Sequence, residues 1–134
     1  MIFLARREHS RQELAYKLAR GCEDQALIGE LLDKLSSEGL QSDERFTESF
    51  VSHRIDSGKG PMKIHQELRE RGIEKTVIQQ YLGSCSIDWL SHAETARIKK
   101  FGDSIPADCA EKSKQLRFLL NRGFSSQLIS QLLS

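Results

Sequence analysis

The feature that most constrains the fold is a helix–Arg-Gly–helix pattern that occurs three times along the 134 residues. The three copies begin with the segments "SRQELAYKLARGC", "PMKIHQELRERGI" and "KSKQLRFLLNRGF". Each has apolar residues four apart, which lie on one face of a helix, and each ends on Arg-Gly, where glycine can adopt the positive φ of a helix terminus. A second short apolar-periodic segment follows each pair, at 27–32, 77–82 and 128–133. The spacing predicts three related helical units, each about 50 residues from the next.

A further helical segment precedes the second and third copies, "DERFTESFVSHRI" and "DWLSHAETARIKKF". We expect Phe46, Phe50 and Val51 to point inward in the former. In the latter the expected inward residues are Trp89, Leu90, Ala93, Ile98 and Phe101. Only "MIFLARR" stands in this place in the first copy, so its first helix is expected to be largely missing.

No run of alternating β-branched residues indicates a strand. The expected fold is therefore all-α, with tandem three-helix repeats in an elongated, curved array. It would contain three units, the first N-terminally truncated, at residues 1–40, 41–85 and 86–134.

The tripeptide Gly58-Lys59-Gly60 invites comparison with a nucleotide phosphate loop, and the sequence argues against it. Such a loop has a glycine five residues before its Gly-Lys pair, and a Ser or Thr after the lysine. Here those positions hold His53 and Gly60, and no strand is predicted upstream. Instead, Gly58 is expected to end one helix and Gly60 to cap the next, with Pro61 in the first helical position. The equivalent "SRQE" of the first copy predicts a capping box.

Composition and spacing give no sign of a metal site, a cofactor or a membrane segment. The three cysteines form no C-x-x-C pair, and the four histidines lack ligand spacing. No long uncharged apolar run or signal peptide is present, so a cytoplasmic protein is expected. The net charge of +1 is low for a protein that binds naked nucleic acid by charge alone. The net charge is −2 for residues 1–60 and +3 for residues 61–134. Such an uneven distribution is more typical of a protein that binds a partner of mixed chemical character.

Three stretches of the chain resemble the RecX family, the regulators of the bacterial RecA recombinase. They are "ARREHSRQELAYKL", "GKGPMKIHQELRERGI" and "LRFLLNRGFSSQLI", and the resemblance extends from Leu4 to Leu133. It implies a non-catalytic regulator in homologous recombination, DNA repair and the SOS response. Family members lie in the groove of the RecA filament on single-stranded DNA, hinder ATP hydrolysis and strand exchange, and favour filament disassembly. By this resemblance the partners would be the RecA filament and, weakly or through it, single-stranded DNA, and we expect a monomer without cofactor.

The candidate contact residues are cations expected to be exposed beside the joints between units. They are Arg6, Arg7 and Arg11 in the first unit, Lys59 and Lys63 before the second Arg-Gly pair, and Arg97, Lys99, Lys100, Lys112, Lys114, Arg117 and Arg122 in the third unit. The last seven fall within 26 positions that hold three acidic residues, so a contact with phosphate is predicted. The aromatic residues Tyr16, Tyr81 and Trp89 either stack on bases or pack between helices, and packing is the preferred interpretation for Tyr81 and Trp89.

Two other functions remain open at the level of sequence. Short helices joined at glycine are also typical of helix-turn-helix DNA-binding proteins. No single segment, however, has the cations and Asn or Gln residues of a major-groove reader. A helical repeat that binds an unrelated protein is the other alternative. No pair of carboxylates or nucleophile–base set indicates an enzyme.

Overall fold

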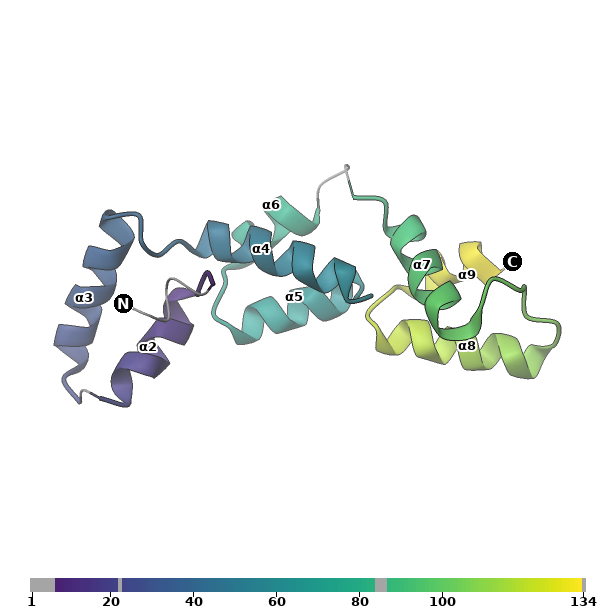
Figure 1. Ribbon diagram of the computed structural model, residues 1–134, viewed down its shortest axis with the longest axis horizontal. Helices are drawn as coiled ribbons and strands as arrows, with labels where there is room; N and C mark the ends of the chain where they lie inside the picture. The colour runs from purple at the N-terminus through teal and green to yellow at the C-terminus, as the bar shows by residue number, and fades with distance from the viewer. Residues whose placement is uncertain (1–6, 22, 84–86, 134) are drawn as a thin grey trace.

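The computed structural model describes residues 7–21, 23–83 and 87–133 and is all-α within them (Figure 1). Its helices are α2 (Arg11–Ala19), α3 (Gln25–Ser37), α4 (Asp43–Asp56), α5 (Pro61–Glu70), α6 (Lys75–Leu82), α7 (Trp89–Phe101), α8 (Cys109–Asn121) and α9 (Ser126–Leu133). The expectation for the first helix of the first unit concerns residues 1–6 and lies outside the described residues. None of the described helices has the length and apolar character needed to span a bilayer.

The helices pack into three units arranged in an elongated row (Figure 1). Unit 1 contains α2 and α3, unit 2 contains α4 to α6, and unit 3 contains α7 to α9. Each unit has its own apolar core, centred on Leu14, Ile64 and Leu119 respectively. Trp89 packs against the cores of both unit 2 and unit 3. Helices α2, α5 and α8 follow one another along one side of the row (Figure 1), so this side presents the same element of each unit.

The helix boundaries follow the predicted caps. Ser10 and Glu13 form the capping box at the start of α2. Gly60 is the N-cap of α5 and Pro61 its first residue, and Gly58 has φ +84° immediately after α4. The Gly-Lys-Gly segment is therefore a joint between two helices, as predicted.

The glycines of the three Arg-Gly pairs are not equivalent. Gly72 and Gly123 have φ values of +81° and +100°, the left-handed conformation expected after a helix. Gly21 does not adopt positive φ, so the prediction is wrong at this position. A Cβ at Gly21 would meet no described atom within 4 Å, whereas at Gly123 it would lie 2.4 Å from the Cβ of Lys63. Two of the three glycines thus do more than end a helix, because the preceding unit packs directly against them.

The buried face of α7 agrees with the prediction at Ala93 and at Trp89, which packs against two cores, but differs at Leu90 and Ile98. Leu90 and Ile98 are each 38% exposed, while the buried residues are Ala93, Ala96 and Arg97. Arg97 was expected among the exposed cations and is only 4% exposed. Its guanidinium donates to Glu94 at 2.6 Å, to the Ser104 carbonyl at 3.1 Å and to Gln115 at 3.4 Å. Arg97 therefore ties α7 to α8 and to the segment that joins them, and it is no longer a candidate contact residue.

Candidate functional site

Units 2 and 3 meet through their backbones at a close contact. The Gly60 N–H donates to the Arg122 carbonyl at 2.7 Å, and the Met62 N–H donates to the Gly123 carbonyl at 3.0 Å. A Cβ on Gly60 would lie 2.5 Å from the carbonyl carbon of Gly123, so glycine is needed here for close approach. These contacts fix the place of the Arg122 backbone relative to the end of α4.

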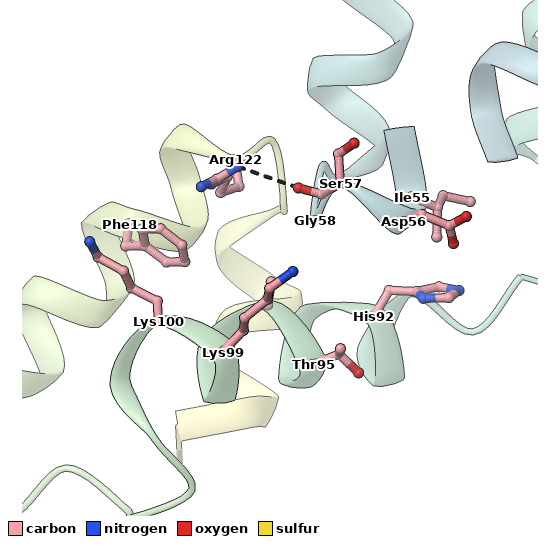
Figure 2. Close-up of a pocket in the computed structure, with 11 residues that line it drawn as sticks. Ile55, Asp56, Ser57, Gly58, His92, Thr95, Lys99, Lys100, Phe118 and Arg122 are labelled. Carbon is pink, nitrogen blue, oxygen red and sulfur yellow. Dashed lines mark hydrogen bonds between the residues drawn. The ribbon is translucent and has the colours of Figure 1, made fainter. Parts of the chain in front are cut away.

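A pocket of about 240 Å³ opens beside this contact, and we call it the second joint pocket (Figure 2). Its walls are the end of α4 and the turn after it, one face of α7, and the last turns of α8. The lining residues are Ile55, Asp56, Ser57, Gly58, His92, Thr95, Ala96, Lys99, Lys100, Phe118 and Arg122. It brings together Lys99, Lys100 and Arg122 from two helices of unit 3, with one carboxylate, Asp56, on the opposite wall.

The cations of the second joint pocket are not neutralised from within the described chain. No ion pair joins Lys99, Lys100 or Arg122 to a described carboxylate. Arg122 lies over the ring of Phe118, 5.1 Å from its centroid, and its Nη1 is 3.5 Å from the Ser57 carbonyl (Figure 2). Both lysines are exposed and lie in the last turn of α7, where positive charge is favourable to the helix dipole. The pocket is therefore positively charged and open to an anion.

A related pocket lies between units 1 and 2, and we call it the first joint pocket. It is lined by Arg7, Glu8, Glu13, Phe46, Ser49, Phe50, His53, Arg54 and Arg71. Its five α4 residues precede the five α7 residues of the second joint pocket by 46 positions each. Each pocket also contains the arginine of an Arg-Gly pair, Arg71 or Arg122. The two pockets are thus repeats of one site.

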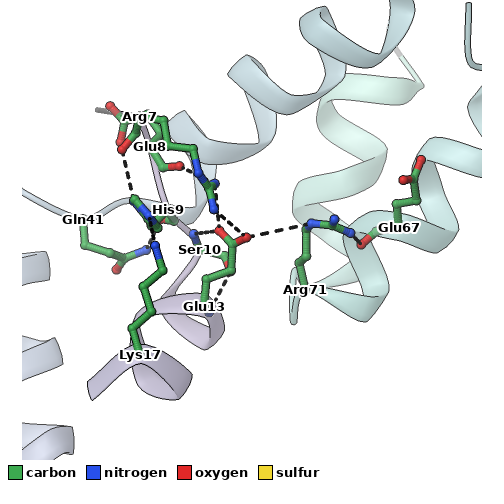
Figure 3. Close-up of polar contacts among 9 residues, drawn as sticks. All are labelled: Arg7, Glu8, His9, Ser10, Glu13, Lys17, Gln41, Glu67 and Arg71. Atoms are coloured by element: carbon green, nitrogen blue, oxygen red, sulfur yellow. Dashed lines mark hydrogen bonds and ion pairs between the residues drawn. The ribbon is translucent and has the colours of Figure 1, made fainter. Parts of the chain in front are cut away.

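The charges of the first joint pocket are paired internally, with Glu13 at the centre (Figure 3). Its carboxylate accepts from Arg7 at 3.1 and 3.2 Å and from the Ser10 N–H at 3.1 Å. Arg71 of unit 2 approaches the same carboxylate, with its Nε 4.0 Å from Oε2. Glu13 therefore caps its own helix and links unit 1 to unit 2.

A second acid completes the pairing of the first joint pocket. Arg54 meets Glu67 at 3.3 Å, and the guanidinium groups of Arg54 and Arg71 each lie 4.8 Å from the centroid of Phe50. One nitrogen of this pair, Nε of Arg54, and one oxygen, Oε1 of Glu67, are buried without a hydrogen-bond partner. The arginines of this pocket are thus held by Phe50 and by two glutamates.

Two ionisable groups near the first joint pocket have shifted pKa values. Burial by itself would raise the pKa of the Glu13 carboxyl, but the hydrogen bonds from Arg7 and from the Ser10 N–H, with the charge of Arg7, bring it below its ordinary value. Burial lowers the pKa of His9, and the positive charges of Arg7 and Lys17 lower it further. His9 is 1% exposed, with Nδ1 3.1 Å from the Arg7 carbonyl and Nε2 2.8 Å from Nζ of Lys17 (Figure 3). His9 is therefore a buried neutral residue beside the capping box that Ser10 and Glu13 form.

The predicted contact residues fall into distinct environments. Arg6 lies outside the described residues. Arg7 pairs with Glu13 and Arg11 with Asp33 at 2.8 Å. Lys59 and Lys63 are half-buried at the contact between units 2 and 3.

Four predicted cations lie on α8 or at its end, and they divide between its faces. Lys114, Phe118 and Arg122 follow one another at intervals of four, so they lie on the face toward the second joint pocket. Arg117 is exposed beside them. Lys112 instead lines a separate groove near Leu116 and Ile129 of α9.

Sequence reasoning missed Arg54, Arg71 and His92, which line the joint pockets. Arg71 could have been identified from the sequence, because Arg71 and the predicted contact residue Arg122 occupy the same place in the repeat. Arg54 and His92 gave no such signal, since their positions depend on how successive units pack. No group of three or more His, Cys, Asp or Glu side chains among the described residues is placed to hold a metal ion.

Comparison with known proteins finds matches to one family over most of the chain. A family model described as the second three-helix domain of RecX matches residues 42–82, and one described as the third matches residues 87–133. The regulatory protein RecX of Pseudomonas fluorescens Pf-5 is 46% identical over 134 residues, covering 100% of this chain and 86% of that protein. The regulatory protein RecX of Halorhodospira halophila is 44% identical over 126 residues, covering 94% and 78%. The fold is similar to the crystal structure of RecX from Lactobacillus salivarius, with a TM-score of 0.80 at 23% identity over 98% of this chain and 87% of that one.

Proposed function

The chain belongs to the RecX family, and from that premise we propose that it is a non-catalytic regulator that binds the RecA filament on single-stranded DNA. It lies in the groove of the filament and inhibits ATP hydrolysis and strand exchange by the recombinase. It acts in the cytoplasm as a monomer and needs no cofactor. The observation that carries the proposal is the match of nearly the whole chain to proteins named regulatory protein RecX.

The distribution of charge supports a partner made of protein and DNA together. The first joint pocket has its arginines paired with its own glutamates, so it contributes little attraction for DNA. The second joint pocket and the adjacent face of α8 have five cations, of which none is paired with a described carboxylate. They are Lys99, Lys100, Lys114, Arg117 and Arg122. Attraction for anionic groups, whether of DNA or of a protein, is thus concentrated on unit 3.

Within this set we assign the DNA contact to Lys114 and Arg117, which are exposed and lie outside the pocket lining. Each lysine or arginine that neutralises a phosphate of single-stranded DNA contributes about 0.7 to the slope of log affinity against log salt. The double variant Lys114→Gln/Arg117→Gln should therefore bind single-stranded DNA and the filament more weakly, with a slope smaller by about 1.4.

The test is a titration of RecA ATPase activity on single-stranded DNA, with filament binding measured by co-sedimentation. The wild-type protein is expected to lower ATP turnover below equimolar amounts. The charge-matched control is Lys34→Gln/Lys75→Gln, which changes two exposed lysines on units 1 and 2 and should behave as wild type. Absence of both inhibition and co-sedimentation would exclude the proposal. Sequence-selective binding to duplex DNA without recombinase would instead indicate a helix-turn-helix DNA-binding protein.

A further inference from the structure

The two joint pockets are built from equivalent positions but differ in one chemical respect. In the first, the arginine of the Arg-Gly pair approaches a carboxylate that the preceding unit supplies, Glu13. Glu13 stands three residues after the helix cap Ser10, and the residue three after the corresponding cap Gly60 is Lys63. The second joint pocket therefore has cations but no carboxylate at the position that Glu13 occupies in the first joint pocket.

The first joint pocket shows which ligand such a site accepts. Glu13 lies 4.0 Å from Nε of Arg71, the counterpart of Arg122. It also accepts from both terminal nitrogens of Arg7, but Ser57 stands in the place of Arg7 in the second unit, so only the contact with Arg71 has a counterpart in the second joint pocket. In the second joint pocket three cations, Lys99, Lys100 and Arg122, surround a space of about 240 Å³, which is large enough for an acidic side chain. The ring of Phe118 lines the pocket beside Lys100 and Arg122 (Figure 2).

From this internal comparison we propose that the second joint pocket binds the carboxylate of an aspartate or glutamate side chain presented by the protein partner. The partner side chain takes the place that Glu13 fills in the first joint pocket. A phosphodiester of the DNA backbone carries the same single negative charge as a carboxylate, so charge does not choose between them, and the assignment of a carboxylate rests on the place of Glu13 in the first joint pocket. This inference rests on the proposed function for the identity of the partner as RecA. The DNA contact assigned to Lys114 and Arg117 is separate from it.

Carbodiimide cross-linking tests the chemistry directly, because the reagent joins a lysine amine to a carboxylate in contact with it as an amide, with loss of water. The full-length protein is treated together with RecA filaments on oligo(dT), and the products are identified by mass spectrometry. The expected products join Lys99 or Lys100 to an aspartate or glutamate of RecA, and Lys34 should give none. Filament binding without any RecA cross-link at the two pocket lysines would overturn the inference while leaving the proposed function intact. Absence of filament binding by the wild-type protein would instead remove the proposed function.

Binding measurements on a pair of variants separate carboxylate from phosphate. Lys99→Gln/Lys100→Gln should weaken binding to the filament about tenfold for each charge-assisted contact that is lost, which is about a hundredfold for the two lysines together. The same variant should keep its affinity for free oligo(dT). An equal loss toward oligo(dT) would show that the pocket binds DNA phosphate and would overturn the inference. Both lysines are exposed and unpaired among the described residues, so the fold is expected to tolerate the change.

A converse variant restores the missing acid. Lys63→Glu places a carboxylate at the position equivalent to Glu13, and it should compete with the partner for the pocket cations. Cross-linking at Lys99 and Lys100 is then expected to fall several-fold below that of Lys63→Gln, which removes the same positive charge without adding a carboxylate. Equal cross-linking in the two Lys63 variants would contradict the assignment of this position.

Discussion

Glu13 shows how one side chain can serve both a helix and the array. Within its own unit it closes the capping box with Ser10, and across the joint it attracts Arg71. The residue is only partly accessible to water, with 20% of its side chain exposed, so its interactions are less weakened by solvent than those of a surface ion pair. The charge of Glu13 should therefore affect the stability of unit 1.

The pKa of Glu13 gives this effect a defined pH dependence. Because the folded protein lowers the pKa of this carboxyl, its ionised form stabilises the fold at pH values above the unfolded pKa, about 4.3. That stabilisation disappears as the pH falls through the folded pKa. Glu13→Gln keeps a capping-box residue and loses the charge, so it should be less stable than wild type by about 1 kcal/mol at pH 7. The difference should shrink as the pH is lowered toward 3, as measured by urea unfolding at several pH values. A difference that stays constant with pH would show that shape, not charge, matters at this position.

The two roles of Glu13 were unequally visible in the sequence. The capping box was predicted from "SRQE", because all of its atoms come from four consecutive residues. The approach of Glu13 to Arg71 joins residues 58 positions apart and depends on how two units pack. Gly21, Gly72 and Gly123 are a second example, since the same Arg-Gly pair accompanies different backbone conformations. Among the described residues, atoms of the preceding unit lie close to Gly72 and Gly123, and none lies within 4 Å of a Cβ placed on Gly21.

At the scale of the helix, α7 combines a buried face with an exposed cationic face. Ala93, Ala96 and Arg97 lie against the rest of unit 3, whereas Lys99 and Lys100 line the second joint pocket. The buried alanines allow close approach of the neighbouring helices, and Arg97 extends to the loop carbonyl of Ser104. Hydrophobic periodicity favoured Leu90 and Ile98 as inward residues, because it ranks side chains by hydrophobicity alone. It cannot identify a buried arginine whose hydrogen bonds are satisfied within the fold.

This division of α7 predicts opposite phenotypes for two cations that are two residues apart. Arg97→Ala should lower the free energy of unfolding by about 2 kcal/mol, less than for a fully buried pair because Glu94 retains access to water. Its effect on binding to the RecA filament should be small once folding is confirmed by circular dichroism. Lys99→Ala should leave stability within about 0.5 kcal/mol of wild type and weaken binding to the RecA filament. Thermal unfolding and filament co-sedimentation distinguish the two. A stable Arg97→Ala variant with reduced binding would restore Arg97 to the contact residues.

At the scale of the whole molecule, three small cores are connected in series and not merged into one. Adjacent units touch through few elements, so their relative placement depends on local contacts at each joint. The first joint is held by polar side chains, including the Arg11 N–H to Asp43 at 2.9 Å and Gln12 to the Glu70 carbonyl at 2.8 Å. The second is held by backbone hydrogen bonds at two glycines and by Trp89, which packs on both cores. We expect these contacts to make the second joint rigid and to keep the cations of unit 3 at a fixed distance from unit 2, as the proposed binding in a filament groove requires.

Substitution of Gly60 by alanine tests whether this rigidity matters for regulation. The residue has φ −94°, so alanine fits its backbone conformation, but the added Cβ would lie 2.5 to 2.7 Å from backbone atoms of Gly123 and Phe124. Since backbone atoms cannot rotate away as a side chain does, unit 3 must shift relative to unit 2. We expect Gly60→Ala to keep its helical content, to change the solution scattering profile, and to inhibit RecA ATPase several-fold less than wild type. The matched control is Gly29→Ala, where a Cβ meets no described atom within 4 Å and the helix gains about 0.5–1 kcal/mol of stability. If Gly60→Ala changed the scattering profile but inhibited RecA as well as Gly29→Ala does, the relative placement of units 2 and 3 would have no part in regulation, and binding would depend on each unit separately.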